Sequence, residues 1–595
     1  MIVRRGFGNK RPFGRRPALR VGAALLLLAG SRGAFGSGPP DWPQWGRNPE
    51  HTGAASVVGQ RLEAILADVL YDPFAVREEQ DSDGELLAHY AVPLIDGPDV
   101  YMAFKSGDYL GFGTWDEIVW SVKKLEWRNG SLVEAWTFDS DWKPVSTLLS
   151  GGWEPVFHPV LAGDFVYVPG VGGTVHRVSK ATGLSVGRLN PFDGVDATRY
   201  VAGGLAAAPD GAVIYNAVET ANGYPIRSGA LVRIAPNGKA AKADFASLVP
   251  GAPGATALCV ANFSRDERPW PPSPTAVPPS FPCGPQRPGI NVIPAVAPDG
   301  TIYTLSVADQ NLRYGYLVAV RPDLTPAWSA SLRGILDDGC GVSLPPNGTA
   351  GGCREGTARG VDPATNERPA GIVADAGTSS PVVLPDGAVL IGAYTGYNFA
   401  RGHLFKFSSS GDALATYDFG WDITPAVWEH DGAYSVLLKD NHYPFRAYCG
   451  DGDCPAETPR YDLVSLDADL VPEWTFTNTT DESCTRQAGE VVCVPAAQAG
   501  FEWCVNQPAV DSTGVVYANS EDGSLYAVEP GGRLRESIFL DSALGAAYTP
   551  VALGPDGLVY TQNNGRLFAV GLARPPRDPL HRIEADHHPV VVGRE

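Results

Sequence analysis

Residues 548–571, YTPVALGPDGLVYTQNNGRLFAVG, contain the unit from which the chain is built. An apolar run with a proline leads into a turn that closes on Gly557, and short β-type runs with aromatic residues follow. The pattern occurs eight times, with turn glycines at Gly97, Gly163, Gly211, Gly300, Gly387, Gly432, Gly514 and Gly557. Their spacings are 66, 48, 89, 87, 45, 82 and 43 residues, so the basic unit has 43 to 48 residues and the longer intervals carry insertions. Repeats of this length with several short strands are typical of β-propeller blades.

We therefore predict an all-β fold, an eight-bladed β-propeller of four-stranded antiparallel blades. The last repeat ends after its third strand, near Gly571, and needs a fourth strand from elsewhere. Residues 41–53, DWPQWGRNPEHTG, are well placed to supply it, so that the N-terminal segment of the mature chain closes the ring and removes an exposed sheet edge. The predicted boundaries are a leader over residues 1–36, the propeller over 37–573 and a polar C-terminal tail over 574–595.

Residues 1–36 carry eight Arg or Lys residues and no acidic residue, and residues 21–30 are apolar. This pattern is typical of a signal peptide, and its apolar stretch is short for a membrane span. Loss of the leader would change the formal net charge from −20 to −28. We predict an exported protein, periplasmic or extracellular, with no transmembrane segment in the mature chain. A mature chain with this negative net charge would be repelled by nucleic acid, which argues against nucleic acid as a partner.

Eight of the nine cysteines form locally spaced pairs, which indicates disulfides in an oxidising compartment. The candidate pairs are Cys259 with Cys283, Cys340 with Cys353, Cys449 with Cys454, and Cys484 with Cys493. Cys504 is left over, and the sequence leaves open which two of Cys484, Cys493 and Cys504 are bonded. None of the spacings matches a haem or zinc motif, and no metal site is predicted.

Three stretches resemble the quinoprotein-type (PQQ-like) β-propeller family: WPQWGRNPEHTG (42–53), GGTVHRVSKATGLSVG (172–187) and DGSLYAVEPGGRL (522–534). The family includes quinone-dependent dehydrogenases and the propeller lipoprotein of the outer-membrane barrel-assembly machinery, but this chain lacks a lipid-attachment cysteine after its leader. The resemblance implies the propeller fold over most of the mature chain. It implies little about activity, because many such propellers bind no cofactor and because function lies in sites added to a fold. The dehydrogenases typically carry a vicinal cysteine disulfide or a haem domain, and neither is present here.

The long insertions predict where recognition takes place. In a four-stranded blade with strands A to D from the axis outward, the B-to-C and D-to-A connections emerge on the same face. All cysteine-bearing insertions fall in these connections. We call this the loop face and expect it to carry the binding site. Ordering a long connection costs conformational entropy, so long connections are usually functional or fixed by cross-links such as disulfides.

Arginine and tyrosine recur together in four B-to-C loops, as Arg227, Arg313, Arg401 and Arg446 beside Tyr224, Tyr314, Tyr397 and Tyr443. An arc of guanidinium groups and rings could hold an anionic or sugar-bearing ligand. Alternatively, the same residues pair with acids of neighbouring blades, which is the simpler interpretation in a repeat protein.

Tryptophans and polar side chains precede strand A in three repeats: Trp153 with Glu154, Trp421 with Asp422, and Trp503 with Asn506. They could form a floor and polar clamp for a flat ligand or a Ca²⁺ ion at the channel mouth. Alternatively, the tryptophans only fill the tops of the blades.

We expect an exported, non-catalytic binding or scaffold protein that holds a protein or glycan partner on its loop face without a cofactor. Two alternatives remain: a PQQ-dependent oxidoreductase that uses Ca²⁺ and has Glu154 or Asp422 as general base, and a cell-surface carbohydrate-binding protein that uses Tyr397 or Tyr443. No catalytic residue is assigned. The candidate ligand-binding residues are Trp153, Glu154, Arg227, Arg313, Tyr397, Arg401, Trp421, Asp422, Tyr443, Arg446 and Asn506.

Overall fold

A computed structural model describes residues 41–146, 151–343, 353–443, 458–487, 489–545 and 547–573. They belong to one compact unit. The predicted leader and C-terminal tail lie outside the described residues. Within these ranges, no helix has the length and apolar character needed to cross a bilayer.

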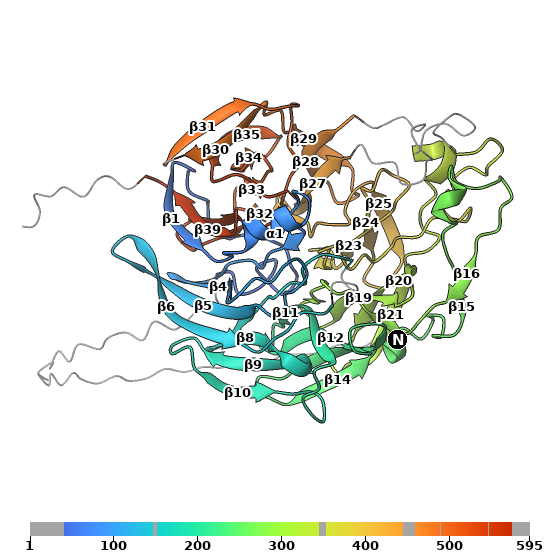
Figure 1. Cartoon of the computed structure of the whole chain (residues 1–595), viewed down its shortest axis with the longest axis horizontal. Helices are drawn as coiled ribbons and strands as arrows, with labels where there is room; N and C mark the ends of the chain where they lie inside the picture. The colour runs from blue at the N-terminus through green and yellow to red at the C-terminus, as the bar shows by residue number, and fades with distance from the viewer. Residues whose placement is uncertain are drawn as a thin grey trace, which may run out of the picture. The chain divides into compact units, whose positions relative to one another are not determined.

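The chain forms an eight-bladed β-propeller in which each blade is a four-stranded antiparallel sheet, and this confirms the predicted fold (Figure 1). The strands of blades 1 to 4, in the order A to D, are β3 (Leu94–Asp96), β4 (Asp99–Ser106), β5 (Val119–Arg128) and β6 (Ser131–Ser140); β7 (Val160–Ala162), β8 (Phe165–Gly170), β9 (Thr174–Ser179) and β10 (Ser185–Leu189); β11 (Arg199–Ala207), β12 (Val213–Thr220), β13 (Ile226–Ile234) and β14 (Ala240–Asp244); β18 (Ala295–Val296), β19 (Ile302–Ala308), β20 (Asn311–Val320) and β21 (Pro326–Ser331).

Blades 5 to 8 repeat this arrangement, with the A strand innermost. Their strands are β22 (Val382–Val383), β23 (Val389–Ala393), β24 (His403–Phe407) and β25 (Ala413–Tyr417); β26 (Ala426–His430), β27 (Ala433–His442), β28 (Arg460–Leu466) and β29 (Pro472–Thr477); β32 (Ala509–Val510), β33 (Val516–Asn519), β34 (Ser524–Glu529) and β35 (Arg533–Phe539); β37 (Ala552–Leu553), β38 (Val559–Asn563), β39 (Arg566–Gly571) and β1 (Ala64–Leu70). In blade 4, β17 (Gln286–Pro288) also pairs with β19.

Local sequence explains each blade. The A-to-B turns close on glycines with positive φ, such as Gly300 (φ 87°) and Gly557 (φ 82°), a conformation that L side chains rarely adopt. Gly557 is also required for steric reasons, because a Cβ at this position would lie 2.4 Å from the carbonyl oxygen of Val58. The B and C strands are buried on both faces because neighbouring blades pack against each side, as along β19, where every residue is buried.

The ring closes through the N-terminal part of the chain, but not through the residues expected. The fourth strand of blade 8 is β1 (Ala64–Leu70), which pairs antiparallel with β39 from Ala64 opposite Gly571 to Leu70 opposite Arg566. The prediction that residues 41–53 supply this strand is wrong. The mostly apolar run AILADVL forms the edge strand, because strand addition needs unbroken extended backbone that the Gly and Pro residues of 41–53 do not offer.

Residues 42–55 instead form what we call the axial plug. This segment passes the A strands of blades 1 to 7 in turn and exchanges one hydrogen bond or more with each. The contacts are Trp42 N to Ile95 O (3.0 Å), Leu161 N to Pro43 O (2.9 Å), Ala207 N to Gln44 Oε1 (2.5 Å), Val296 N to Pro49 O (2.7 Å), Val383 N to Glu50 O (2.9 Å), Val427 N to Thr52 O (2.7 Å) and Val510 N to Gly53 O (3.0 Å). Since the A strands line the axis, the plug fills the channel beside the short A-to-B turns.

Helices are few and short: α1 (Ala75–Asp81), α2 (Phe245–Leu248) and the one-turn segments η1 (Val171–Gly173), η2 (Arg265–Glu267) and η3 (Gly339–Ser343). The remaining strands lie in insertions or at the channel mouth: β2 (Ala88–His89) with β36 (Ala547–Tyr548), β15 (Leu258–Val260) with β16 (Ser280–Pro282), and β30 (Glu482–Gln487) with β31 (Glu490–Pro495).

Three of the predicted disulfides are present: Cys259–Cys283, Cys340–Cys353 and Cys484–Cys493. The choice among the last three cysteines is thereby resolved, and Cys504 is a buried free thiol. All three disulfides lie in D-to-A connections, as the sequence predicted. Cys449 and Cys454 lie outside the described residues.

Candidate functional site

The channel mouth on the loop face is closed by the segment that carries β2. This segment pairs in parallel with β36 and, through Ala88, forms a bridge with Glu154. The ring nitrogen Nε2 of His89 lies 2.6 Å from the carbonyl oxygen of Ala376 in the connection between blades 4 and 5. One short segment thus contacts the connections into blades 2, 5 and 8.

Three near-parallel rings meet at this mouth. His89 lies 4.7 Å from Trp153 and 5.1 Å from Tyr548 between ring centroids, and Trp153 lies 5.8 Å from Tyr548. All interplanar angles are below 20°. Burial lowers the pKa of His89 to about 3, so its ring is neutral at physiological pH and stacks without a charge to solvate.

A buried ammonium group with three carboxylates lies beside the rings. Lys105 Nζ is 2.6 Å from Glu154, 2.8 Å from Asp72 and 3.4 Å from Glu78, and all four side chains are almost fully buried. Burial alone would lower the pKa of Lys105, but the three carboxylates raise it well above the usual value. Burial also raises the pKa of Glu154 to about 8 and that of Glu78 to about 7, because one ammonium cannot neutralise three acids.

A second buried lysine lies across the mouth. Lys439 Nζ is 2.8 Å from Asp422 and 3.8 Å from the ring centroid of Tyr548, and the side chains of Lys439 and Asp422 are fully buried. Glu502 accepts hydrogen bonds from Tyr548 (2.9 Å) and Tyr443 (3.0 Å). Burial raises the pKa of Glu502; the attraction of Lys439 offsets this effect only in part, and repulsion from Asp422 adds to it.

A third buried ion cluster lies between blades 4 and 5. Arg287 forms a bidentate pair with Asp375 (2.8 and 2.7 Å) and binds Asp309 through Nε (3.0 Å). These side chains and Tyr224 help to line a cavity of about 270 Å³ on the loop face. The guanidinium is saturated by acids of its own chain, so it offers little to an anionic ligand.

The structure splits the predicted residues into two groups. Trp153, Glu154, Asp422, Tyr443 and Asn506 come together around the mouth, where Asn506 donates to the carbonyl oxygen of Tyr548 (3.4 Å). Trp421 packs edge-on against Tyr394 at 5.5 Å, and the fully buried Trp503 packs against Tyr526. These two tryptophans fill the blade tops, as in the simpler interpretation.

The arginines and tyrosines of the B-to-C loops do not form an open arc. Arg313 binds Asp362 (2.5 Å) and Asn262 (2.7 Å), and Arg401 binds Asp418. Tyr397 is buried and donates to Asp338 (2.8 Å). Arg227 is exposed on β13, and Arg446 lies outside the described residues. Pairing with neighbouring acids is therefore the arrangement of Arg313 and Arg401.

Sequence reasoning missed the groups that hold the mouth together: His89, Tyr548 and the two buried lysines. A signal was present for the lysines, because Lys105 and Lys439 interrupt otherwise apolar B strands, AFKSG and SVLLKDNH. A lysine in such a run requires a buried partner. No comparable local signal marks His89 or Tyr548, whose contacts are made only when blades 1, 2, 5 and 8 are assembled.

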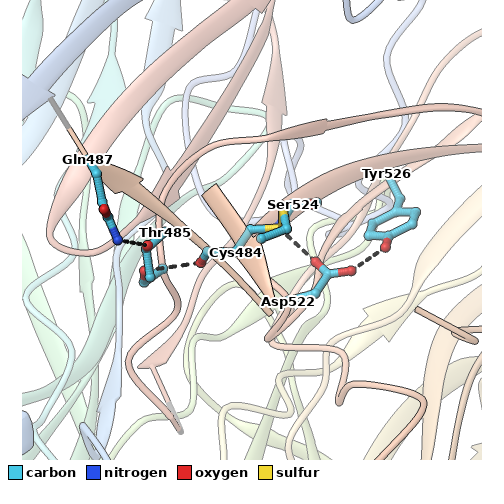
Figure 2. Close-up of a disulfide and its surroundings, with 8 residues drawn as sticks. Cys484, Thr485, Gln487, Asp522, Ser524 and Tyr526 are labelled. Carbon is cyan, nitrogen blue, oxygen red and sulfur yellow. Dashed lines mark hydrogen bonds between the residues drawn. A yellow bond between two sulfur atoms is a disulfide. The ribbon is translucent and has the colours of Figure 1, made fainter. Parts of the chain in front are cut away.

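The stapled hairpin β30–β31 is the most exposed ordered insertion in the described part of the chain. Its disulfide joins directly opposed residues, Cys484 and Cys493, and the disulfide appears in Figure 2 with Thr485 and Gln487 of β30. Arg486 donates to the carbonyl oxygens of Leu540 (2.6 Å) and Phe539 (3.0 Å), which ties the hairpin to blade 7. The valines of β31 face solvent, with exposed fractions of 44% at 491, 41% at 492 and 58% at 494.

Comparisons with known proteins support the fold. No protein-family model matches the sequence, and no curated protein matches it either. Among solved structures, a "Europium-containing methanol dehydrogenase" is similar with a TM-score of 0.50 at 12% identity, over 88% of this chain and 89% of that one. A quinohemoprotein alcohol dehydrogenase from Comamonas testosteroni is similar with a TM-score of 0.50 at 13% identity, over 91% and 82%. BamB from Moraxella catarrhalis gives a TM-score of 0.38 at 12% identity, over 82% and 97%.

The chain shares its β-propeller fold with these dehydrogenase structures. At these identities the likeness extends to the fold alone and carries no activity with it.

The buried carboxyl of Glu154 gives a first testable expectation. Because its folded-state pKa is raised to about 8 from 4.5, the folded protein keeps a proton that the unfolded chain has lost, and the unfolding free energy falls as pH rises between these values. Glu154→Gln lacks this titrating carboxyl. Between pH 5 and pH 8 we therefore expect the free energy of unfolding to fall less in the variant than in the wild type, by on the order of a few kcal/mol. Urea unfolding at several pH values measures the difference. Parallel profiles would mean that Glu154 is ionised throughout.

Proposed function

We propose that this chain is an exported, non-catalytic propeller that binds a partner protein through its loop face, with the stapled hairpin β30–β31 as the contact element. The observation that carries the proposal is the hairpin itself. It is ordered by a disulfide and by Arg486, yet three of its valines are exposed. Among the described strands β31 pairs only with β30, so its outer edge has main-chain groups available to an extended segment of another protein.

The geometry of the mouth argues against the quinone-dependent alternative. A cofactor of that class would have to lie flat at the mouth, where His89, Trp153 and Tyr548 already pack together. The cavity beside Glu154 has a free volume of about 20 Å³, whereas ligand pockets measure roughly 300–1,000 Å³. Both candidate bases, Glu154 and Asp422, are engaged by buried lysines. The residues present therefore do not fit the cofactor, and we derive no reaction step through it.

A glycan-binding role has less support, because the two tyrosines proposed for it do not face solvent. Tyr397 is buried and bonded to Asp338, and Tyr443 is partly buried and bonded to Glu502. Stacking on a sugar needs an open ring face. Export itself is supported by the three disulfides, which persist in oxidising compartments.

The partner is tested by site-specific photo-crosslinking in the exported protein fraction of the source organism. With the crosslinker at position 492, we expect one discrete adduct, identified by mass spectrometry. Val492→Glu together with Val494→Glu should reduce the complex at least about tenfold, since two buried charges oppose docking by more than 1.4 kcal/mol. Val186, which is 48% exposed on the outer strand of blade 2, provides the matched control for both crosslinker and glutamate.

Two results would contradict the proposal. One is an equal yield of adducts at positions 492 and 186, which would mean that the hairpin has no special affinity. The other is quinone-dependent and Ca²⁺-dependent dye reduction by the purified protein, which would establish the oxidoreductase instead.

A further inference from the structure

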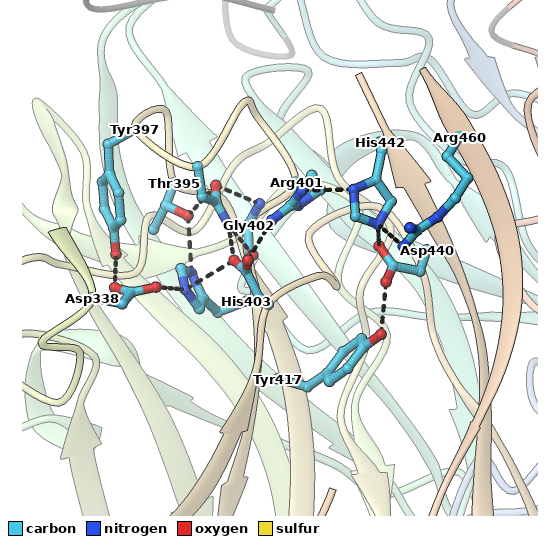
Figure 3. Close-up of polar contacts among 12 residues, drawn as sticks. Asp338, Thr395, Tyr397, Arg401, Gly402, His403, Tyr417, Asp440, His442 and Arg460 are labelled. Carbon is cyan, nitrogen blue, oxygen red and sulfur yellow. Dashed lines mark hydrogen bonds and ion pairs between the residues drawn. The ribbon is translucent and has the colours of Figure 1, made fainter. Parts of the chain in front are cut away.

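A histidine and two aspartates meet on the loop face of blade 5, away from the channel mouth. His403 is the first residue of β24, and Asp338 comes from the insertion between β21 and β22 (Figure 3). Asp418 directly follows β25. His403 Nε2 lies 2.6 Å from Asp338 Oδ2 and 3.4 Å from Asp418 Oδ1. One ligand atom from each residue lies within 4.8 Å of the other two.

Hydrogen-bond directions determine which nitrogen of His403 carries a proton. The amide of Asn398 is oriented by Gly402, whose N–H donates to Oδ1 (3.1 Å) and whose carbonyl accepts from Nδ2 (2.7 Å). Thr395 therefore donates its only proton to Asn398 Oδ1 (2.8 Å). Its oxygen, 3.0 Å from His403 Nδ1, must then accept, so Nδ1 is the protonated nitrogen.

The other nitrogen, Nε2, consequently faces two carboxylate oxygens. In a neutral imidazole with the proton on Nδ1, Nε2 has only a lone pair, and a lone pair beside two anionic oxygens is repulsive. The arrangement is stable only with a positive charge between the three atoms. That charge is either a proton, carried by His403 or shared with one of the carboxylates, or a bound metal ion.

The surroundings are those of a metal site. Each carboxylate is oriented by a further side chain: Tyr397 donates to Asp338 Oδ1 (2.8 Å), while Asn398 (2.6 Å) and Arg401 donate to the two oxygens of Asp418. His403 is buried, whereas the side chain of Asp418 is 40% exposed, which leaves a route to solvent.

The ligand set selects the kind of ion. Tetrahedral bonds of about 2.0–2.1 Å separate ligand atoms by about 3.3 Å, close to the 3.4 Å between His403 and Asp418. In this geometry the distance from His403 Nε2 to Asp338 Oδ2, now 2.6 Å, would have to increase by about 0.7 Å. One imidazole and two carboxylates, with Arg401 offsetting one charge, suit Zn²⁺ better than Ca²⁺, which takes 6–8 oxygen ligands.

We propose that His403, Asp338 and Asp418 bind one Zn²⁺ ion, which ties the disulfide-closed insertion between blades 4 and 5 to blade 5. This site is independent of the channel mouth and of the hairpin. It places a divalent cation on the face assigned to partner binding.

Isothermal titration calorimetry with Zn²⁺ tests the site. The full-length exported protein is prepared without a polyhistidine tag and is first dialysed against chelator. We expect one equivalent of Zn²⁺ whose affinity falls at least about 100-fold in His403→Gln and Asp338→Asn, because loss of outer-shell partners alone costs 10–100-fold. His430→Gln is the matched control, since His430 has a single aspartate neighbour, Asp431, at 3.8 Å. The triple variant His581→Gln/His587→Gln/His588→Gln controls for the histidines of the C-terminal tail.

Zinc uptake lost in the tail variant but kept in His403→Gln would overturn the proposal, and so would the absence of binding. A second measurement avoids variants that fail to fold: anomalous diffraction at the zinc edge from wild-type crystals grown with Zn²⁺. We expect a peak beside His403 Nε2. No peak there would mean that a proton, not a metal, lies between the imidazole and the carboxylates.

Discussion

A chain that lacks residues 41–70 is expected not to fold into a soluble monomer. The deletion removes β1, which leaves β39 as an unpaired edge of blade 8, and it also removes the axial plug, which bonds to the A strands of seven blades. Trp42 and Trp45 are both buried in the plug, and burial of each is worth about 3–5 kcal/mol against alanine. The two rings together account for about 6–10 kcal/mol. This is comparable to the whole stability of about 5–15 kcal/mol that is typical of a protein, before the loss of β1 is counted.

Size-exclusion chromatography and circular dichroism measure the effect, and adding residues 41–70 as a separate peptide should restore the monomer. A peptide with Trp42→Ala and Trp45→Ala serves as the control, because it keeps the strand but loses the buried rings. A truncated chain that stays monomeric and unfolds cooperatively at wild-type denaturant concentration would show that the plug and the closing strand are dispensable.

Lys439→Met is expected to destabilise the folded chain by about 3–5 kcal/mol near pH 8. The substitution keeps the volume of the side chain but leaves Asp422 fully buried without its ammonium partner. Glu502 and Glu521 lie nearby with raised pKa values, about 8 for Glu521, which burial causes and the charge of Glu502 reinforces. Because carboxylates without a counter-ion take up protons on folding, we expect the loss to be smaller at pH 5 than at pH 8.

Denaturant unfolding of Lys439→Met, followed by tryptophan fluorescence at the two pH values, checks this prediction. The control is Lys123→Met: Lys123 pairs with Glu134 at 2.7 Å, but its side chain is 26% exposed, and such surface pairs contribute about 0–1 kcal/mol. Adding Asp422→Asn to Lys439→Met should recover part of the loss. Equal losses in the two single lysine variants would mean that the buried pair contributes no more than a surface pair.

Much of the fold could be predicted from the sequence, because the repeat is a local pattern. Each blade can be recognised in the sequence by a turn glycine with β-type runs on either side. The three described disulfides are also local, since each joins cysteines that are 24 residues apart or fewer. The closing strand was misplaced because the tryptophan-rich residues 41–53 stand out in the sequence, whereas AILADVL resembles any other strand. Register on a distant partner such as β39 leaves no mark on the strand itself.

The candidate site was predicted less well than the fold. The structure places Glu154 and Asp422 at the mouth, where each is paired with a buried lysine, Lys105 or Lys439, that the sequence analysis did not consider. The arginines of the B-to-C loops looked like one repeated ligand site, yet Arg313 pairs with Asp362 and Arg401 with Asp418.

The sequence by itself determined the number of blades, the acidic body and the side of each insertion, because turn chemistry, charge and strand alternation are properties of neighbouring residues. Only the tertiary structure decided that residues 42–55 fill the axis, that His89 closes the mouth and that His403 faces two aspartates. These contacts join segments far apart in the chain: Ala55 and Val510, whose backbones are joined by a hydrogen bond, are 455 residues apart. Closure of the ring brings them within hydrogen-bonding distance, and no local pattern encodes which side chains will then meet.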